Sequence, residues 1–178
     1  MLYKLRRLNC NKGLLLSLSY SIFQSHLTYG IYLWGNAEPF ILNKIILSQK
    51  RAIRVIAGLG YGESTENAFF DLKVLKVEDL FQFLFTSVMW DLDRGNLPSC
   101  FNNIFRRVSD IHHYNTRCSA AHKLLENVRI NTKTHGESML KFIGPKILNE
   151  LKNHDYFNFS KTKKSFQGKY KQYLLSSY

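Results

Sequence analysis

The sequence is poor in cysteine and lacks long apolar runs, and both features exclude whole classes of protein. Its three cysteines, Cys10, Cys100 and Cys118, form no C-x-x-C pair, so we expect no disulfide framework. No stretch approaches 18 consecutive apolar residues, so we expect no helix that spans a membrane. Together these features predict an intracellular protein, nuclear or cytoplasmic and not secreted.

Acidic residues are also scarce. The chain has 13 of them against 25 lysines and arginines, which gives a formal charge of +12 at pH 7. Residues 1–60 contain 8 basic side chains and 1 acidic one, residues 61–100 contain 3 and 7, and residues 101–178 contain 14 and 5. This excess favours an anionic partner, and its uneven spread indicates that only some surfaces face the anion.

The N-terminal stretch leaves a targeting segment open as an alternative. A basic lead, MLYKLRRLNCNK, precedes the apolar run GLLLSLSYSIF, and the first acidic residue is Glu38, as in signal and transit peptides. However, no A-x-A-like cleavage site follows, and apolar residues continue at helical spacing towards Trp34. We therefore expect an internal helix, with a cleaved organellar leader as the alternative.

Apolar residues recur at helical spacing over most of the chain, which predicts a mainly α fold. The helices that we expect are Lys12 to about Tyr29, Pro39 to about Gly58, Ser64 to Leu72, about 77–94, Gly144 to Leu151, and a last one around Phe166 to Leu174. One small β-hairpin is expected at residues 128–143, where Val128, Ile130 and Thr132 alternate and Met139 to Ile143 return as a second strand.

The stretch NKIILSQKRAIRVIAG, Asn43 to Gly58, has two chemically different faces when it is wound into a helix. The apolar face contains Leu42, Ile45, Ile46, Gln49, Ile53 and Ile56. The opposite face contains no carboxylate and four cations, Lys44, Lys50, Arg51 and Arg54. Such a basic stripe favours phosphates, and bases would stack on aromatic rings at the helix ends, namely Tyr29, Tyr32, Trp34 and Tyr61. The alternative is a solvated face.

Motifs for catalysis, cofactors and metals are missing. Gly58, Gly60 and Gly62 follow a helix and depart from G-x-G-x-x-G, which indicates a connector. The soft ligands match no common zinc spacing; they are Cys100, His112, His113, Cys118 and His122. Asp91 and Asp93 point in different directions on a helix, and we expect them to be solvated. We therefore expect no catalytic residue, no cofactor, no metal site and no small-molecule substrate.

Three segments, LLLSLSYSIFQSHLTYGIYLWGNA, LNKIILSQKRAIRVIAG and FFDLKVLKVEDLFQF, resemble in this order the region after the catalytic palm in reverse transcriptases of non-LTR retrotransposons, the jockey-like elements in particular. LPSCFNNIFR, IHHYNTR, IGPKILNEL and SFQGKYKQYLL are similar to later landmarks of that region, so the resemblance covers about residues 2–175. It implies a thumb-like helical subdomain at residues 1–60 and a C-terminal post-thumb region at residues 61–178. Leu148 and Lys152 stand where the family tends to have tryptophan and proline.

The resemblance implies that the basic stripe, together with Arg117 of HHYNTR, binds a template–primer such as an RNA–DNA hybrid or RNA. The family's Y-x-D-D motif, which holds the catalytic metals, is absent. We therefore expect a fragment of an RNA-directed DNA polymerase that is not an enzyme on its own. The alternative is a protein-interaction module, in which apolar helix faces around 12–29 and 77–94 meet the missing palm domain or another protein.

Overall fold

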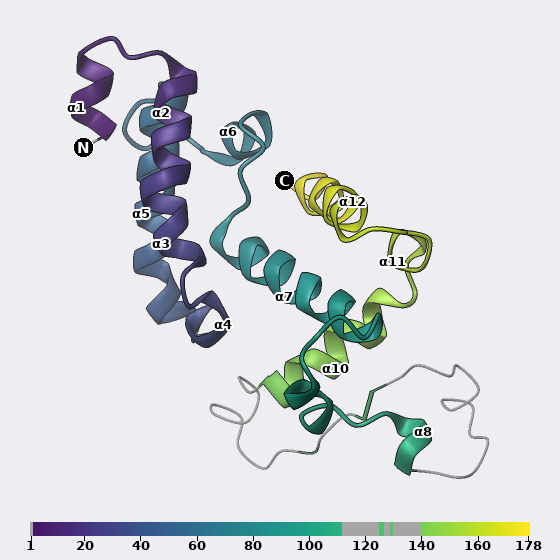
Figure 1. Ribbon diagram of the computed structural model, residues 1–178. Helices are drawn as coiled ribbons and strands as arrows, with labels where there is room; N and C mark the ends of the chain where they lie inside the picture. Colours follow the sequence, from purple (N-terminus) through teal and green to yellow (C-terminus); the bar gives the residue numbers. More distant parts are fainter. Residues whose placement is uncertain (1, 112–124, 127–128, 130–139) are drawn as a thin grey trace. The chain divides into compact units, whose positions relative to one another are not determined.

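A computed structural model of the chain describes residues 2–111, 125–126, 129 and 140–178 (Figure 1). The regular elements in these ranges are all helices. The β pairing within the same ranges is an isolated antiparallel bridge between Arg107 and Leu125. The predicted mainly α fold is therefore confirmed. The chain forms two compact units, residues 1–82 with 171–178, and residues 83–170. The first unit extends past residue 60, which is the boundary that the resemblance implies for the thumb-like subdomain. The division into a thumb-like and a post-thumb region stays a prediction.

The first unit is built from short helices and one long helix. They are α1 (Leu2–Arg7), α2 (Lys12–Leu18), the π-helix η1 (Ser19–Gln24), α3 (Ser25–Thr28), α4 (Ile31–Trp34), α5 (Pro39–Ala57) and α6 (Glu66–Asp71). Because α2, η1 and α3 follow one another without a break, the helix predicted from Lys12 is confirmed. Asn11 caps its first turn by accepting a hydrogen bond from the Gly13 N–H at 3.1 Å.

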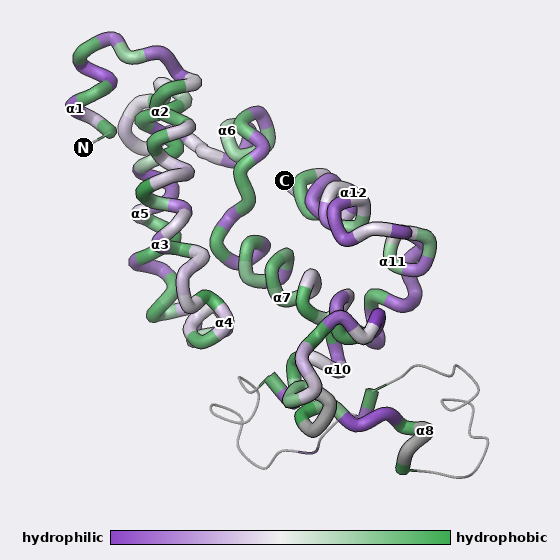
Figure 2. Tube along the Cα trace, viewed as in Figure 1, coloured by the Kyte–Doolittle hydropathy of each residue, from purple (hydrophilic) through white to green (hydrophobic). Residues whose placement is uncertain are grey.

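Helix α5 begins and ends as its sequence predicts. Pro39 occupies the first helical turn, where its missing N–H costs no hydrogen bond. Gly58 follows Ala57 in the left-handed conformation at φ +86° and stops the helix. Leu42, Ile53 and Ile56 are buried, and Figure 2 shows apolar and polar residues interleaved along α5. The apolar face thus packs inward, as the spacing predicts.

Gln49 is the one polar residue on that apolar face, and it is 2% exposed. Its side-chain amide donates to the Leu75 carbonyl at 2.8 Å and accepts from the Val77 N–H at 3.1 Å. Val77 begins helix α7 (Val77–Asp93), whose first N–H groups have no partner within the helix. Gln49 therefore ties α5 to the start of α7 by satisfying buried backbone groups.

The second unit packs around the aromatic residue Phe166. It contains most of α7, η2 (Ser99–Asn103), α8 (Val108–Ile111), α10 (Leu140–Leu151), α11 (Asp155–Asn158) and the first part of α12 (Lys163–Leu175). The Phe166 ring stacks on Trp90 at 6.0 Å and meets Phe157 edge-on at 5.6 Å between ring centroids. Phe85 and Met89 are also buried. The apolar face of α7 is thus covered within the chain.

Helix α10 corrects two sequence predictions. Leu140 to Ile143 are helical, so the second strand predicted there is wrong, while residues 128 and 130–139 of the predicted hairpin lie outside the described residues. The helix also begins before Gly144 and carries Pro145 in its interior. Gly144 lies so close to Phe105 that a β-carbon on it would approach the ring to 2.5 Å. We infer that burial on both sides of Pro145 offsets the hydrogen bond that proline removes.

Asp91 and Asp93 pair with different lysines, and the prediction that they are solvated is wrong. Asp91 pairs with Lys163 of α12, and Asp93 pairs with Lys152 at 3.3 Å. The Asp91 and Asp93 side chains are only 14% and 10% exposed, and the lysines that pair with them come from the start of α12 and from the residue after α10. Lys152 thus has an ionic partner in Asp93.

Candidate functional site

The predicted basic stripe lies on α5 and differs in exposure along its length. Lys44 and Arg51 are exposed, whereas Lys50 and Arg54 are half-buried. The Arg54 Nε donates to the Glu63 carbonyl at 3.1 Å, which holds the connector after α5 against the helix. Ile53 on the opposite face is 2% exposed. The stripe is therefore fixed by core packing on one side and is accessible on the other.

Helix α1 adds a cation that sequence reasoning missed. The Arg6 Nη1 donates to the Val55 carbonyl at 2.7 Å and to the Arg54 carbonyl at 3.3 Å. These carbonyls belong to the last turn of α5, where the helix dipole favours positive charge; the Arg54 carbonyl also accepts from the Gly58 and Leu59 N–H groups that end the helix. Arg6 therefore caps α5 and holds α1 beside the basic stripe.

Four arginines from these two helices line one hollow of about 770 Å³. We call this space the arginine hollow. The charged and aromatic residues of its lining are Arg6, Arg7, Arg51, Arg54, Tyr3 and Tyr61. None of the described residues that line it is acidic. Tyr3 is 65% exposed and Tyr61 is fully exposed, and the Arg7 guanidinium lies 5.9 Å from the Tyr3 ring centroid. The site therefore combines positive charge with accessible aromatic rings.

The glycine-rich connector closes one side of the arginine hollow. At Gly58 a β-carbon would lie 2.9 Å from the Arg6 Nη2, so a larger residue would displace this guanidinium. Gly62 adopts a left-handed conformation at φ +90°, in a turn beside Tyr61. A β-carbon on Gly60 would lie 2.9 Å from the Glu63 Oε1. The glycines thus let the chain turn tightly beside the arginines, with Glu63 as a carboxylate next to the rim.

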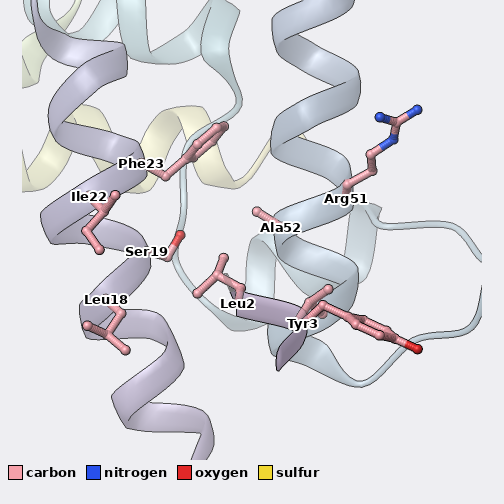
Figure 3. Close-up of a pocket in the computed structure, with 9 residues that line it drawn as sticks. Leu2, Tyr3, Leu18, Ser19, Ile22, Phe23, Arg51 and Ala52 are labelled. Atoms are coloured by element: carbon pink, nitrogen blue, oxygen red, sulfur yellow. The ribbon is translucent and has the colours of Figure 1, made fainter. Parts of the chain in front are cut away.

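An apolar pocket of about 300 Å³ adjoins the arginine hollow (Figure 3). Its lining residues are Leu2, Tyr3, Leu18, Ser19, Ile22, Phe23, Arg51, Ala52 and Val55. Tyr3, Arg51 and Val55 line both spaces. In Figure 3 the Tyr3 ring and the Arg51 guanidinium extend away from Leu18 and Ile22. These two side chains therefore stand at the border between an apolar and a basic compartment.

The structure brings together only part of the set predicted from the sequence. Arg51, Arg54 and Tyr61 line the arginine hollow, whereas Lys44 and Lys50 do not. Trp34 is half-buried and its Nε1 donates to the Tyr29 carbonyl at 3.2 Å. Arg117 lies outside the described residues. The basic stretch LYKLRR was the signal in the sequence for Arg6 and Arg7. Spacing along the chain, however, does not show that Arg6 and Arg51, which are 45 positions apart, lie close together.

Within the described ranges, no group of three histidine, cysteine or acidic residues is placed to hold a metal ion. His112, His113, Cys118 and His122 lie outside those ranges. No helix in the described part of the chain is long and apolar enough to cross a membrane.

Comparisons with known proteins add no relative. No protein-family model matches the chain, and neither a curated protein nor a solved structure is significantly similar to it.

Proposed function

We propose that this chain binds nucleic acid through the arginine hollow, as a fragment of a non-LTR reverse transcriptase that has no polymerase activity on its own. The observation that carries the proposal is the meeting of four arginines from α1 and α5 in one hollow without an acidic lining residue. A guanidinium presents several N–H donors in a planar fork that matches phosphate oxygens. Like charges gathered in this way are best explained by an anionic ligand.

The extent of the basic surface favours a polyanion over a single small anion. Lys44 and Arg54 are ten positions apart on α5, which corresponds to about 15 Å along a helix axis. Phosphates in one strand of a duplex repeat about every 3.4 Å along its axis, so such a surface can meet several of them. Contacts of this kind give affinity without reading sequence, as expected for a thumb that grips a template–primer.

A salt series with a labelled RNA–DNA hybrid tests the proposal. The variant Lys50→Glu/Arg51→Glu/Arg54→Glu reverses three charges on α5. A matched control, Lys161→Glu/Lys164→Glu/Lys169→Glu, reverses three exposed charges elsewhere. We expect wild-type affinity to fall steeply with salt, and the α5 variant to bind more weakly and with a shallower slope than the control. Equal affinities and slopes in the two variants would overturn the proposal.

A protein-interaction module is the second candidate, and exposed apolar side chains favour it. Leu33 is 90% exposed, Tyr29 85% and Phe40 75%. They lie in and around α4 and the start of α5, while the apolar face of α7 is buried. Exposed apolar surface of this kind promotes association. Sedimentation that shows a monodisperse monomer with nucleic-acid affinity would reject this candidate, whereas self-association without affinity would favour it.

A further inference from the structure

We propose that the apolar pocket beside the arginine hollow holds one unpaired nucleobase of the nucleic acid whose phosphates the hollow binds. This inference rests on the proposed function and deepens it, because it names the preferred ligand as a strand with an unpaired nucleotide. The pocket has the size, the lining and the position that such a ligand requires.

The pocket is bounded by four helical elements of the first unit. Leu2 comes from α1, Leu18 and Ile22 come from α2 and η1, and Ala52 comes from α5 (Figure 3). Its volume of about 300 Å³ is at the lower end of the range for small-molecule sites, roughly 300–1,000 Å³. A space of this size suits a single flat ring system.

The border between the pocket and the hollow matches the two halves of a nucleotide. Phe23 and Tyr3 offer aromatic surface on which a base can stack, and every base has a π-face. Arg51 lines both spaces, so its guanidinium is placed for the phosphate attached to that base. A ligand with an uncharged ring and an adjacent phosphate would therefore occupy both the apolar pocket and the arginine hollow. A simple anion would occupy only the hollow, and a simple apolar ligand only the pocket.

Pairing decides which bases can enter. A base in a duplex must lose its stacking and pairing to leave the helix, whereas an unpaired base loses much less. The pocket side chains are mostly apolar and offer few hydrogen-bonding groups, such as the Ser19 hydroxyl. We therefore expect a preference for unpaired nucleotides and little discrimination among the four bases.

The test compares a fully paired RNA–DNA hybrid with the same hybrid carrying a one-nucleotide bulge of the fluorescent base 2-aminopurine. Ala52→Leu fills the pocket from α5, and Ser19→Leu fills it from the opposite wall. Ser48→Leu adds a leucine to the exposed face of α5 one turn earlier and is the control. Circular dichroism establishes that each variant keeps the helical content of the wild type.

We expect the full chain to bind the bulged hybrid at least about fivefold more tightly than the paired one, with a change in 2-aminopurine fluorescence. Both pocket-filling variants should lose this preference and keep the affinity and salt dependence for the paired hybrid. Ser48→Leu should behave as the wild type. Equal wild-type affinity for the two hybrids, or a preference that survives in both folded pocket-filling variants, would overturn this inference alone. Absence of binding to either hybrid would overturn the proposed function as well.

Discussion

The Arg6 guanidinium donates a hydrogen bond to the Val55 backbone carbonyl at 2.7 Å, across 49 positions of sequence. The same nitrogen reaches the Arg54 carbonyl at 3.3 Å. This contact places α1 against the end of α5 and brings Arg7 to the same hollow as Arg51. It therefore links the stability of the first unit to the assembly of its basic site.

Replacing Arg6 by glutamine should destabilise the fold and weaken nucleic-acid binding together. The loss of a charge-assisted cap on α5 is worth about 1–2 kcal/mol of unfolding free energy. Arg7→Gln is the matched control, because Arg7 is exposed and should affect binding alone. Urea unfolding measures the first effect and anisotropy the second; identical stabilities of the two variants would contradict a capping role for Arg6.

Replacing Gln49 by leucine should destabilise the first unit although leucine suits an apolar helix face. The substitution leaves the Leu75 carbonyl and the Val77 N–H buried without the Gln49 amide, at a cost of roughly 2–4 kcal/mol. Ser48→Leu, on the exposed face one position earlier, should change the unfolding free energy by less than about 0.5 kcal/mol. Chemical denaturation compares them, and a neutral Gln49→Leu would show that the amide contacts are dispensable.

The environment of Tyr178 should make the free energy of unfolding depend on pH in the alkaline range. Burial, followed by its hydrogen bond to the Asp79 carboxylate at 2.6 Å, raises the pKa of the Tyr178 hydroxyl well above its ordinary value. As pH rises above about 10, the unfolded chain therefore loses this proton while the folded chain keeps it, and folding stability falls. Below that value the stabilisation is fully present.

Tyr178→Phe tests this assignment. At neutral pH the variant should be less stable by about 1–3 kcal/mol, because the Asp79 carboxylate and the Lys76 N–H lose their partner. Its stability should then decline less steeply than that of the wild type between about pH 9 and 11. Denaturant midpoints measured across this range give the two slopes, and parallel curves would refute the raised pKa.

Local patterns were sufficient to predict the helices whose sequences contain clear start and stop residues. Pro39 and Gly58 bound α5, since each acts through its own backbone conformation. The signal failed at Pro145, where rules for isolated helices predict a start and tertiary packing continues the helix on both sides. The ion pairs of Asp91 and Asp93 could not be predicted from local patterns, because Lys163 begins α12 and Lys152 follows α10, both far from α7 in sequence.

The candidate site was predictable only where it lies on one helix. The periodicity of α5 placed Arg51 and Arg54 on an accessible face, and both line the arginine hollow. Arg6 and Tyr3 enter the same hollow through the contact between α1 and α5, which no local pattern encodes. The stripe residues Lys44 and Lys50 share the helix but lie beyond the hollow.

The central claim is that α1 and α5 bind phosphates together, and the salt dependence of a two-helix variant tests it most directly. Arg7→Gln/Arg51→Gln removes one hollow arginine from each helix, and Lys161→Gln/Lys164→Gln removes two exposed charges elsewhere. Between about 50 and 200 mM salt, we predict that the slope of log affinity against log salt for an RNA–DNA hybrid falls by about 2 in the hollow variant, one for each lost phosphate contact. Slopes that match between this variant and its control would contradict the account.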